Sequence, residues 1–192
     1  KPQISWTLPS MNGFGAKIGL FDPDDVQADT TGFGATEGHA PRVEAQITYN
    51  GDFQGLGVNL WVDGTYQNTE RTTAEGENVK NSSSASGTTF SGEDLDVDSA
   101  GVGFGTKLTY DAFSLVASGF YASGLGIRGQ HSVGPRNTFG NTTAAGAVGA
   151  LDDVGKERKT YGGYIQGTFD FGQGTSVGYS YGGNYMRMTG SD

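Results

Sequence analysis

The chain has 192 residues, a formal net charge of −9 and no cysteine. The lack of cysteine excludes a disulfide framework and thiol chemistry, and the acidic balance makes nucleic acid an unexpected partner, because like charges repel. Glycine is unusually frequent at 34 residues while hydrophobic residues reach only 34%, an odd composition for a soluble core. No stretch approaches the roughly 20 apolar residues of a transmembrane helix.

Apolar and polar residues alternate with the two-residue period of a β-strand in eight segments. The clearest is 55–67, where every second residue from Leu56 to Val62 is apolar. The alternation is less regular later, because Phe120 and Tyr164 fall on the polar side of their strands. In chain order the predicted strands are 4–8, 14–20, 42–49, 55–67, 102–110, 113–121, 160–171 and 177–186.

The connections between these segments alternate in length. The four short ones contain the turn residues Pro, Gly, Asn or Asp, and they are Pro9–Gly13, Asn50–Gln54, Asp111–Ala112 and Gly172–Gly174. The three long ones, 21–41, 68–99 and 126–159, are rich in Gly, Ser, Thr and Asn. This rhythm is typical of a transmembrane β-barrel, with short periplasmic turns and long extracellular loops. We therefore predict one all-β domain over 1–192, an antiparallel up-and-down β-barrel of the bacterial outer membrane.

In each predicted strand, the alternate positions that carry polar residues would face the interior of such a barrel. We predict that these pore-lining residues are Lys17, Arg42, Glu44, Gln46, Asn59, Trp61, Asp63, Lys107, Gln166 and Asp170. Three are basic and three are acidic, so they indicate no ion selectivity, which the narrowest part of a pore would set. The alternative is that they form the solvated face of strands in some other β-protein.

Aromatic residues on the apolar side of the predicted strands gather near the strand ends. Interfacial girdles of a barrel would contain such residues, although aromatics are also common in strands generally. The expected girdle residues are Tyr49, Tyr66, Tyr110, Phe113, Tyr121, Phe169 and Phe171.

The net charge lies almost entirely in the long connections, which together carry −8. Two acidic trios could collect Ca²⁺ or Mg²⁺ through carboxylate oxygens; they are Asp22, Asp24 and Asp25, and Asp94, Asp96 and Asp98. The second trio fails as an EF-hand loop, because Ser99 and Gly105 stand where the turn glycine and the bidentate glutamate are needed. We expect solvated loop charge, no metal site and no cofactor.

Several hairpins resemble those of the Gram-negative general porins. The matching stretches are 3–23, 41–49 with 59–64, 113–126, 155–169 and 176–182. The resemblance implies a sixteen-stranded barrel that assembles as a homotrimer, contacts outer-membrane lipid and lipopolysaccharide, and lets small hydrophilic solutes and ions diffuse passively.

The same resemblance implies that about half of the barrel wall is present. The chain begins after the segment that would hold the constriction loop and ends before a final strand with a terminal aromatic residue. The first predicted strand runs toward the short turns and the eighth runs back, so both chain ends lie on the side of the long loops. A complete single-chain barrel would instead start and finish at the periplasmic face. No signal peptide opens the chain, so we expect mature material or part of a longer protein.

Three other functions are open to such a chain. An enzyme is disfavoured, because His39 and His131 lie in predicted loops without a Gly-x-Ser-x-Gly elbow or a metal-spaced cluster. A surface barrel could act as an adhesin or receptor through its acidic loops without conducting. A soluble β-sandwich would need no detergent for extraction.

Overall fold

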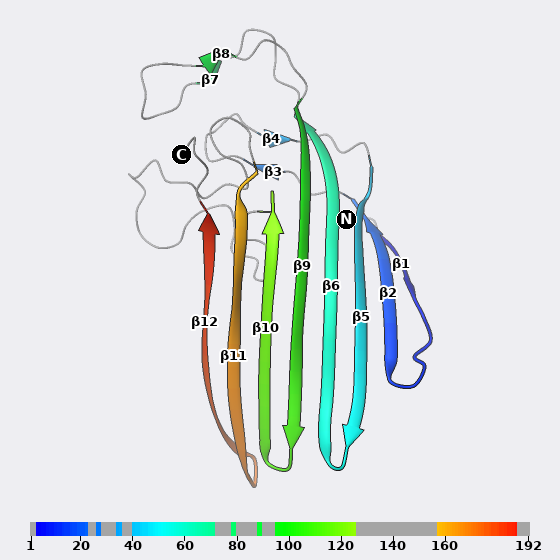
Figure 1. Ribbon diagram of the computed structural model, residues 1–192, viewed down its shortest axis with the longest axis vertical. Coiled ribbons are helices and arrows are strands. Elements are labelled where there is room, and N and C mark those ends of the chain that lie inside the picture. The colour runs from blue at the N-terminus through cyan, green and yellow to red at the C-terminus, as the bar shows by residue number, and fades with distance from the viewer. Residues whose placement is uncertain are drawn as a thin grey trace.

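A computed structural model describes residues 3–22, 40–71, 95–125 and 157–187, together with four two-residue strands. Eight strands form one antiparallel sheet in chain order (Figure 1), namely β1 (Gln3–Thr7), β2 (Phe14–Phe21), β5 (Arg42–Phe53), β6 (Leu56–Arg71), β9 (Leu95–Tyr110), β10 (Phe113–Ser123), β11 (Lys159–Gly172) and β12 (Thr175–Arg187). Two small ladders pair β3 (Val26–Gln27) with β4 (Gly34–Ala35) and β7 (Asn78–Val79) with β8 (Thr88–Thr89). The eight-stranded, up-and-down arrangement predicted from the alternation is confirmed.

In the described parts of the chain, no helix is both long and apolar enough to cross a bilayer.

The turns between paired strands are tight. At Gln54-Gly55 and at Gln173-Gly174 both residues have positive φ, from 55° to 87°. This is the backbone of a type I′ hairpin turn, whose twist matches the twist of the strands. Each glycine adopts it without steric cost, because it has no Cβ.

The turn between β5 and β6 is shorter than the predicted connection Asn50–Gln54. β5 continues through Phe53, so only Gln54 and Gly55 form the turn. The reason is that Asn50 pairs with Asn59 in the ladder and accepts a hydrogen bond from its side-chain amide. Two asparagines therefore extend the hairpin instead of ending it.

The predicted loop 68–99 is also shorter in the structure. β6 runs to Arg71 and β9 begins at Leu95, so Asp98 lies in a strand and not in a loop. The Asp98 carboxylate accepts hydrogen bonds from Tyr66 Oη at 2.7 Å and from Asn68 Nδ2 at 3.1 Å. These polar cross-strand bonds continue the ladder past the end of the apolar alternation. Most of the other predicted loop residues lie outside the described part of the chain.

The sheet has two open edges. β1 pairs only with β2, through five residue pairs, and β12 pairs only with β11. The eight strands do not close into a barrel on themselves. Because their number is even, the two edge strands run in opposite directions.

The register gives the sheet two chemically different faces, because residues paired across antiparallel strands lie on the same face. One row of successive partners crosses the whole sheet through Thr7, Lys17, Gln46, Asp63, Gly103, Phe120, Gly162 and Asn184. The neighbouring row on the opposite side runs through Ala16, Ile47, Val62, Phe104, Gly119, Gly163 and Gly183. We call the first side the polar face and the second the apolar face.

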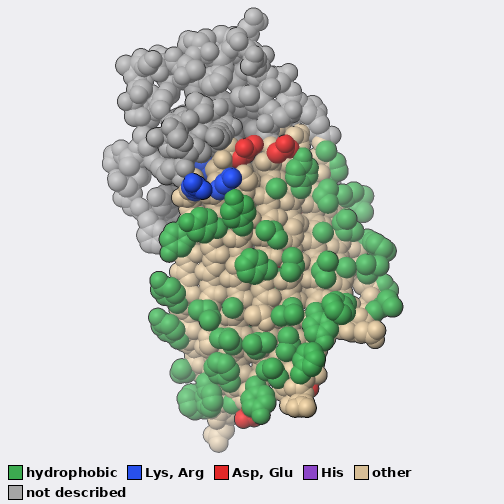
Figure 2. Space-filling model, viewed as in Figure 1, with side chains coloured by type: hydrophobic (Ala, Val, Ile, Leu, Met, Phe, Trp, Pro, Cys, Tyr) green, Lys and Arg blue, Asp and Glu red, His purple; other side chains and the backbone are tan. Residues whose placement is uncertain are grey.

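The apolar face is largely uncovered. Hydrophobic side chains are spread over the strands in Figure 2, and exposure reaches 75% at Ile4 and 76% at Tyr179. Among the described residues the only buried apolar ones are Phe120 and Ala122. The sheet therefore has the opposite of a soluble domain's arrangement, in which large apolar side chains gather in a core.

Candidate functional site: the polar face of the sheet

All ten residues predicted to line a pore lie on the polar face. Lys17, Gln46 and Asp63 are successive partners in one row. Two rows closer to the short turns, Asn59, Lys107 and Gln166 share a second row that also contains Val116. The others occupy the same side at further positions, with Arg42 and Glu44 toward the long connections, Trp61 between the two rows and Asp170 beside the last turn.

Glycines of β9 make room for the large side chains of β6. A Cβ placed on Gly105 would overlap the indole ring of Trp61, and one on Gly103 would lie 2.5 Å from Asp63 Oδ1. The β6 side chains thus lean across onto the backbone of β9. An aromatic ring that covers a cross-strand glycine is a known stabilising pair in sheets. These glycines therefore have a packing role, because a side chain would displace Trp61 or Asp63.

The same arrangement recurs near the other edge of the sheet. A Cβ on Gly162 would lie 2.9 Å from Phe120 Cε1, and one on Gly182 would lie 2.6 Å from Tyr164 Cβ. Phe120 is only 6% exposed as a result. The two aromatics that broke the sequence alternation therefore face the polar side, and the Phe120 ring lies over Gly162 of the next strand.

Arg42 and Glu44 form an ion pair toward the long-connection side of the polar face. Arg42 Nε lies 2.9 Å from Glu44 Oε1, and the guanidinium carbon is 5.3 Å from the centroid of the Phe21 ring. The Arg42 side chain is 18% exposed, whereas that of Glu44 is 42% exposed. The pair and the ring contact hold two opposite charges at a defined place, although such a pair contributes at most about 1 kcal/mol at a wet surface.

The remaining polar groups offer hydrogen bonding to water and solutes. The Asn59 amide bonds to Asn50, and Gln166 Nε2 donates to Thr168 Oγ1 at 3.5 Å. Within the described part of the chain no group of three His, Cys, Asp or Glu could hold a metal ion. His39, His131, Asp24, Asp25 and Asp94 lie outside that part. The polar face is thus a wall of mixed charge and amides.

Aromatic side chains mark both borders of the apolar face. On the turn side, Phe53, Tyr110, Phe113 and Phe169 belong to one row of the register. On the other side, Tyr121, Tyr161 and Tyr185 are successive partners. The rings of Tyr161 and Tyr185 stack with centroids 5.6 Å apart. The predicted aromatic positions therefore do lie on the apolar face, and Tyr161 and Tyr185 add to them.

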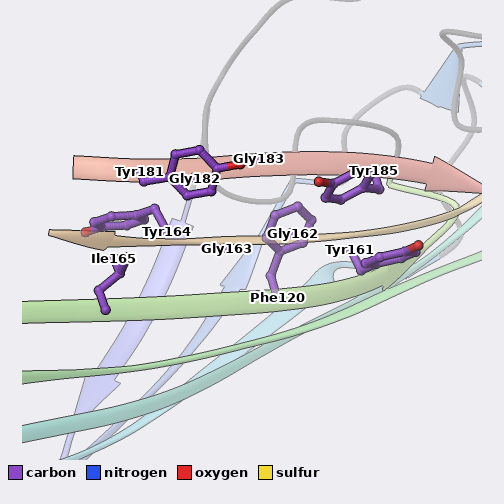
Figure 3. Close-up of a pocket in the computed structure, with 10 residues that line it drawn as sticks. All are labelled: Phe120, Tyr161, Gly162, Gly163, Tyr164, Ile165, Tyr181, Gly182, Gly183 and Tyr185. Atoms are coloured by element: carbon purple, nitrogen blue, oxygen red, sulfur yellow. The ribbon is translucent and has the colours of Figure 1, made fainter.

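The sequence pattern missed a shallow hollow where four glycines meet. Gly163 of β11 pairs with Gly183 of β12, and the adjacent Gly162 and Gly182 pair with Asn184 and Tyr164. The hollow measures about 410 Å³, and tyrosines, Phe120 and Ile165 line it (Figure 3). The two Gly-Gly pairs, spaced so that they meet across a hairpin, were the only signal in the sequence.

Comparison with known proteins leaves the family open. No protein-family model, no curated protein and no solved structure matches this chain.

Proposed function

We propose that this chain forms part of the wall of a passive outer-membrane channel, a diffusion porin for small hydrophilic solutes and ions. The observation that carries the proposal is the two-sided sheet, which leaves a face of large apolar side chains exposed and holds charges and amides on its other face. In a barrel wall the first would meet lipid and the second would meet water. A soluble sheet would instead cover its apolar face with another layer.

The height of the apolar face fits a bilayer. Leu56 and Tyr66, which lie near its two borders on β6, are ten residues apart. At about 3.3 Å per residue this is roughly 33 Å along the strand, or roughly 25 Å of height at a tilt near 40°, which is the height of the apolar band of outer-membrane barrels. On this proposal the spanning segments end at the row of Leu56 on the short-turn side and at the row of Tyr66 on the long-connection side.

The proposed channel needs more strands than the eight described here. About eight strands enclose only packed side chains, whereas sixteen leave an aqueous bore. The open edges at β1 and β12 are available for antiparallel pairing with further strands. The porin resemblance supplies the rest of the proposal, which is a sixteen-stranded homotrimer in contact with lipid and lipopolysaccharide.

Single cysteines test which face meets water, because the natural chain has none. Gln46 and Ile47 are neighbours on β5 that lie on opposite faces. In protein reconstituted into lipid vesicles, Q46C should react rapidly with a charged, water-soluble thiol reagent, since the reactive thiolate forms only in water. I47C should stay unmodified until detergent is added. Equal reaction of both variants without detergent would contradict a lipid-facing apolar side.

Conductance tests the channel itself. The purified native protein should produce discrete conductance steps in a planar bilayer, and modification of Q46C by the charged reagent should change their size, because the added charge lies in the bore. Native protein that inserts but gives no steps would overturn the porin proposal. It would favour the adhesin or receptor alternative.

A further inference from the structure

Two cations lie directly opposite each other at the long-connection border of the apolar face. Lys159 of β11 pairs with Arg187 of β12, and both side chains are exposed. Lys and Arg side chains lie together at this border in Figure 2. Like charges on opposite strands repel and destabilise the ladder. Among the described residues neither has an ion-pair partner, although Glu157 lies two positions before Lys159 on the same face.

An apolar strip continues from this pair toward the short turns. The stacked pair Tyr161 and Tyr185 comes first, at an interplanar angle of 21°. Gly163 and Gly183 form the next row, and Ile165 with Tyr181 the one after. These residues are among those that line the hollow of about 410 Å³ (Figure 3), whose lining also includes Phe120, Gly162, Tyr164 and Gly182 from rows of the polar face. The strip therefore has aromatic borders, a glycine floor and a cationic end.

We propose that this strip binds one lipid that carries an anionic phosphate headgroup and acyl chains. The phosphate would lie between Lys159 and Arg187, where it would relieve their mutual repulsion through charge-assisted hydrogen bonds. An acyl chain would run over the two tyrosine rings and along the glycine floor. A lipid fits better than a second copy of the chain, because a flexible acyl chain can follow a shallow apolar hollow and its phosphate matches two cations that have no ion-pair partner among the described residues.

This inference rests on the proposed function, since it needs the apolar face to meet a bilayer. The probe is phosphatidylglycerol, with phosphatidylcholine of the same acyl chains as comparison. Native mass spectrometry of the detergent-solubilised protein should show one phosphatidylglycerol retained in preference to phosphatidylcholine. Inorganic phosphate alone should not displace it, because it lacks the acyl contacts.

Removal of the two cations tests the headgroup site. The double variant Lys159→Gln with Arg187→Gln should weaken phosphatidylglycerol retention roughly 30-fold. Each cation near an anionic lipid contributes about 1 kcal/mol of binding free energy, and about 1.4 kcal/mol corresponds to a tenfold change in affinity. The matched control is Lys17→Gln with Lys107→Gln, which removes the same charge from the polar face and should leave lipid retention unchanged. Equal loss in both variants would mean net charge, and not this site, holds the lipid.

Filling the hollow tests the acyl-chain site. The three atoms nearest to a Cβ on Gly183 all belong to the Tyr185 ring and hydroxyl, the closest at 3.6 Å, so Gly183→Leu can enter the hollow without a close backbone contact at its Cβ. The control is Gly167→Leu on the same face of β11, where the nearest atom is Phe113 Cε2 at 3.8 Å. Gly183→Leu should reduce phosphatidylglycerol retention, whereas Gly167→Leu should not.

The outcomes separate this inference from the proposed function. A protein that folds and inserts but retains phosphatidylglycerol equally in all variants overturns the lipid site alone. A dimer mass that disappears in Gly183→Leu would identify a second copy of the chain as the occupant and also overturn the lipid site. Protein that folds in water without detergent would instead overturn the membrane proposal.

Discussion

The two faces of the sheet are built from the same strands and differ in how their side chains pack. On the polar face Trp61, Asp63 and Phe120 lean over glycines of the next strand, so neighbouring strands lock together. On the apolar face Ile47, at 59% exposure, and its neighbours project outward with little cover. Contacts within the sheet therefore stabilise the polar face, whereas the stability of the apolar face depends on what surrounds the molecule.

Placing a charge on each face gives the largest expected effect. Ile47→Arg puts a cation near the middle of the apolar band and should destabilise the protein in lipid by about 2–4 kcal/mol. Its neighbour Gln46→Arg adds the same charge to the polar face and should change stability by less than about 0.5 kcal/mol. Urea unfolding from lipid vesicles, followed by tryptophan fluorescence, measures both. Similar values for the pair would mean that the apolar face does not meet hydrocarbon.

A methyl group added to a glycine on each face gives the next largest effect. Gly105→Ala on the polar face would displace the Trp61 ring and should cost about 1–3 kcal/mol. Gly167→Ala on the apolar face would make only ordinary van der Waals contact with Phe113 and should stabilise the strand by about 0.5–1 kcal/mol, because glycine loses more backbone entropy on folding. The same unfolding measurement applies. A neutral Gly105→Ala would show that the ring covering Gly105 contributes nothing.

The smallest expected effect concerns Asp98, in the row beyond the apolar band on the long-connection side. Hydrogen bonds from Asn68 and then Tyr66 lower the pKa of the Asp98 carboxyl. Because the folded-state pKa is lowered, the stability it contributes is present above the unfolded-state pKa and is lost as pH falls through the folded value. Asn68→Ala should raise the pKa of Asp98, as followed by carboxyl-carbon NMR in micelles. Asn184→Ala is the control, and a pKa that stays unchanged in Asn68→Ala would exclude this hydrogen bond as the cause.

Local patterns in the sequence were enough for the strands and their faces. Successive side chains of a strand point to opposite faces, so the alternation from Leu56 to Val62 predicts which residues of that strand share a face of the sheet. The turn at Gln173-Gly174 was predictable because glycine favours positive φ. The pattern placed strand ends less well, as at Asn50 and Asp98, because cross-strand hydrogen bonds there extend the ladder beyond the apolar alternation.

The eight-stranded, two-faced antiparallel sheet could therefore be predicted from the sequence, because the strand period and the turn chemistry are properties of neighbouring residues. The contacts between residues of distant segments became visible only in the three-dimensional fold. The register placed Trp61 over Gly105, Lys159 opposite Arg187, and four glycines together between β11 and β12. Such pairings depend on the alignment of strands that are far apart in the chain, and a shift of one residue would move every side chain to the other face.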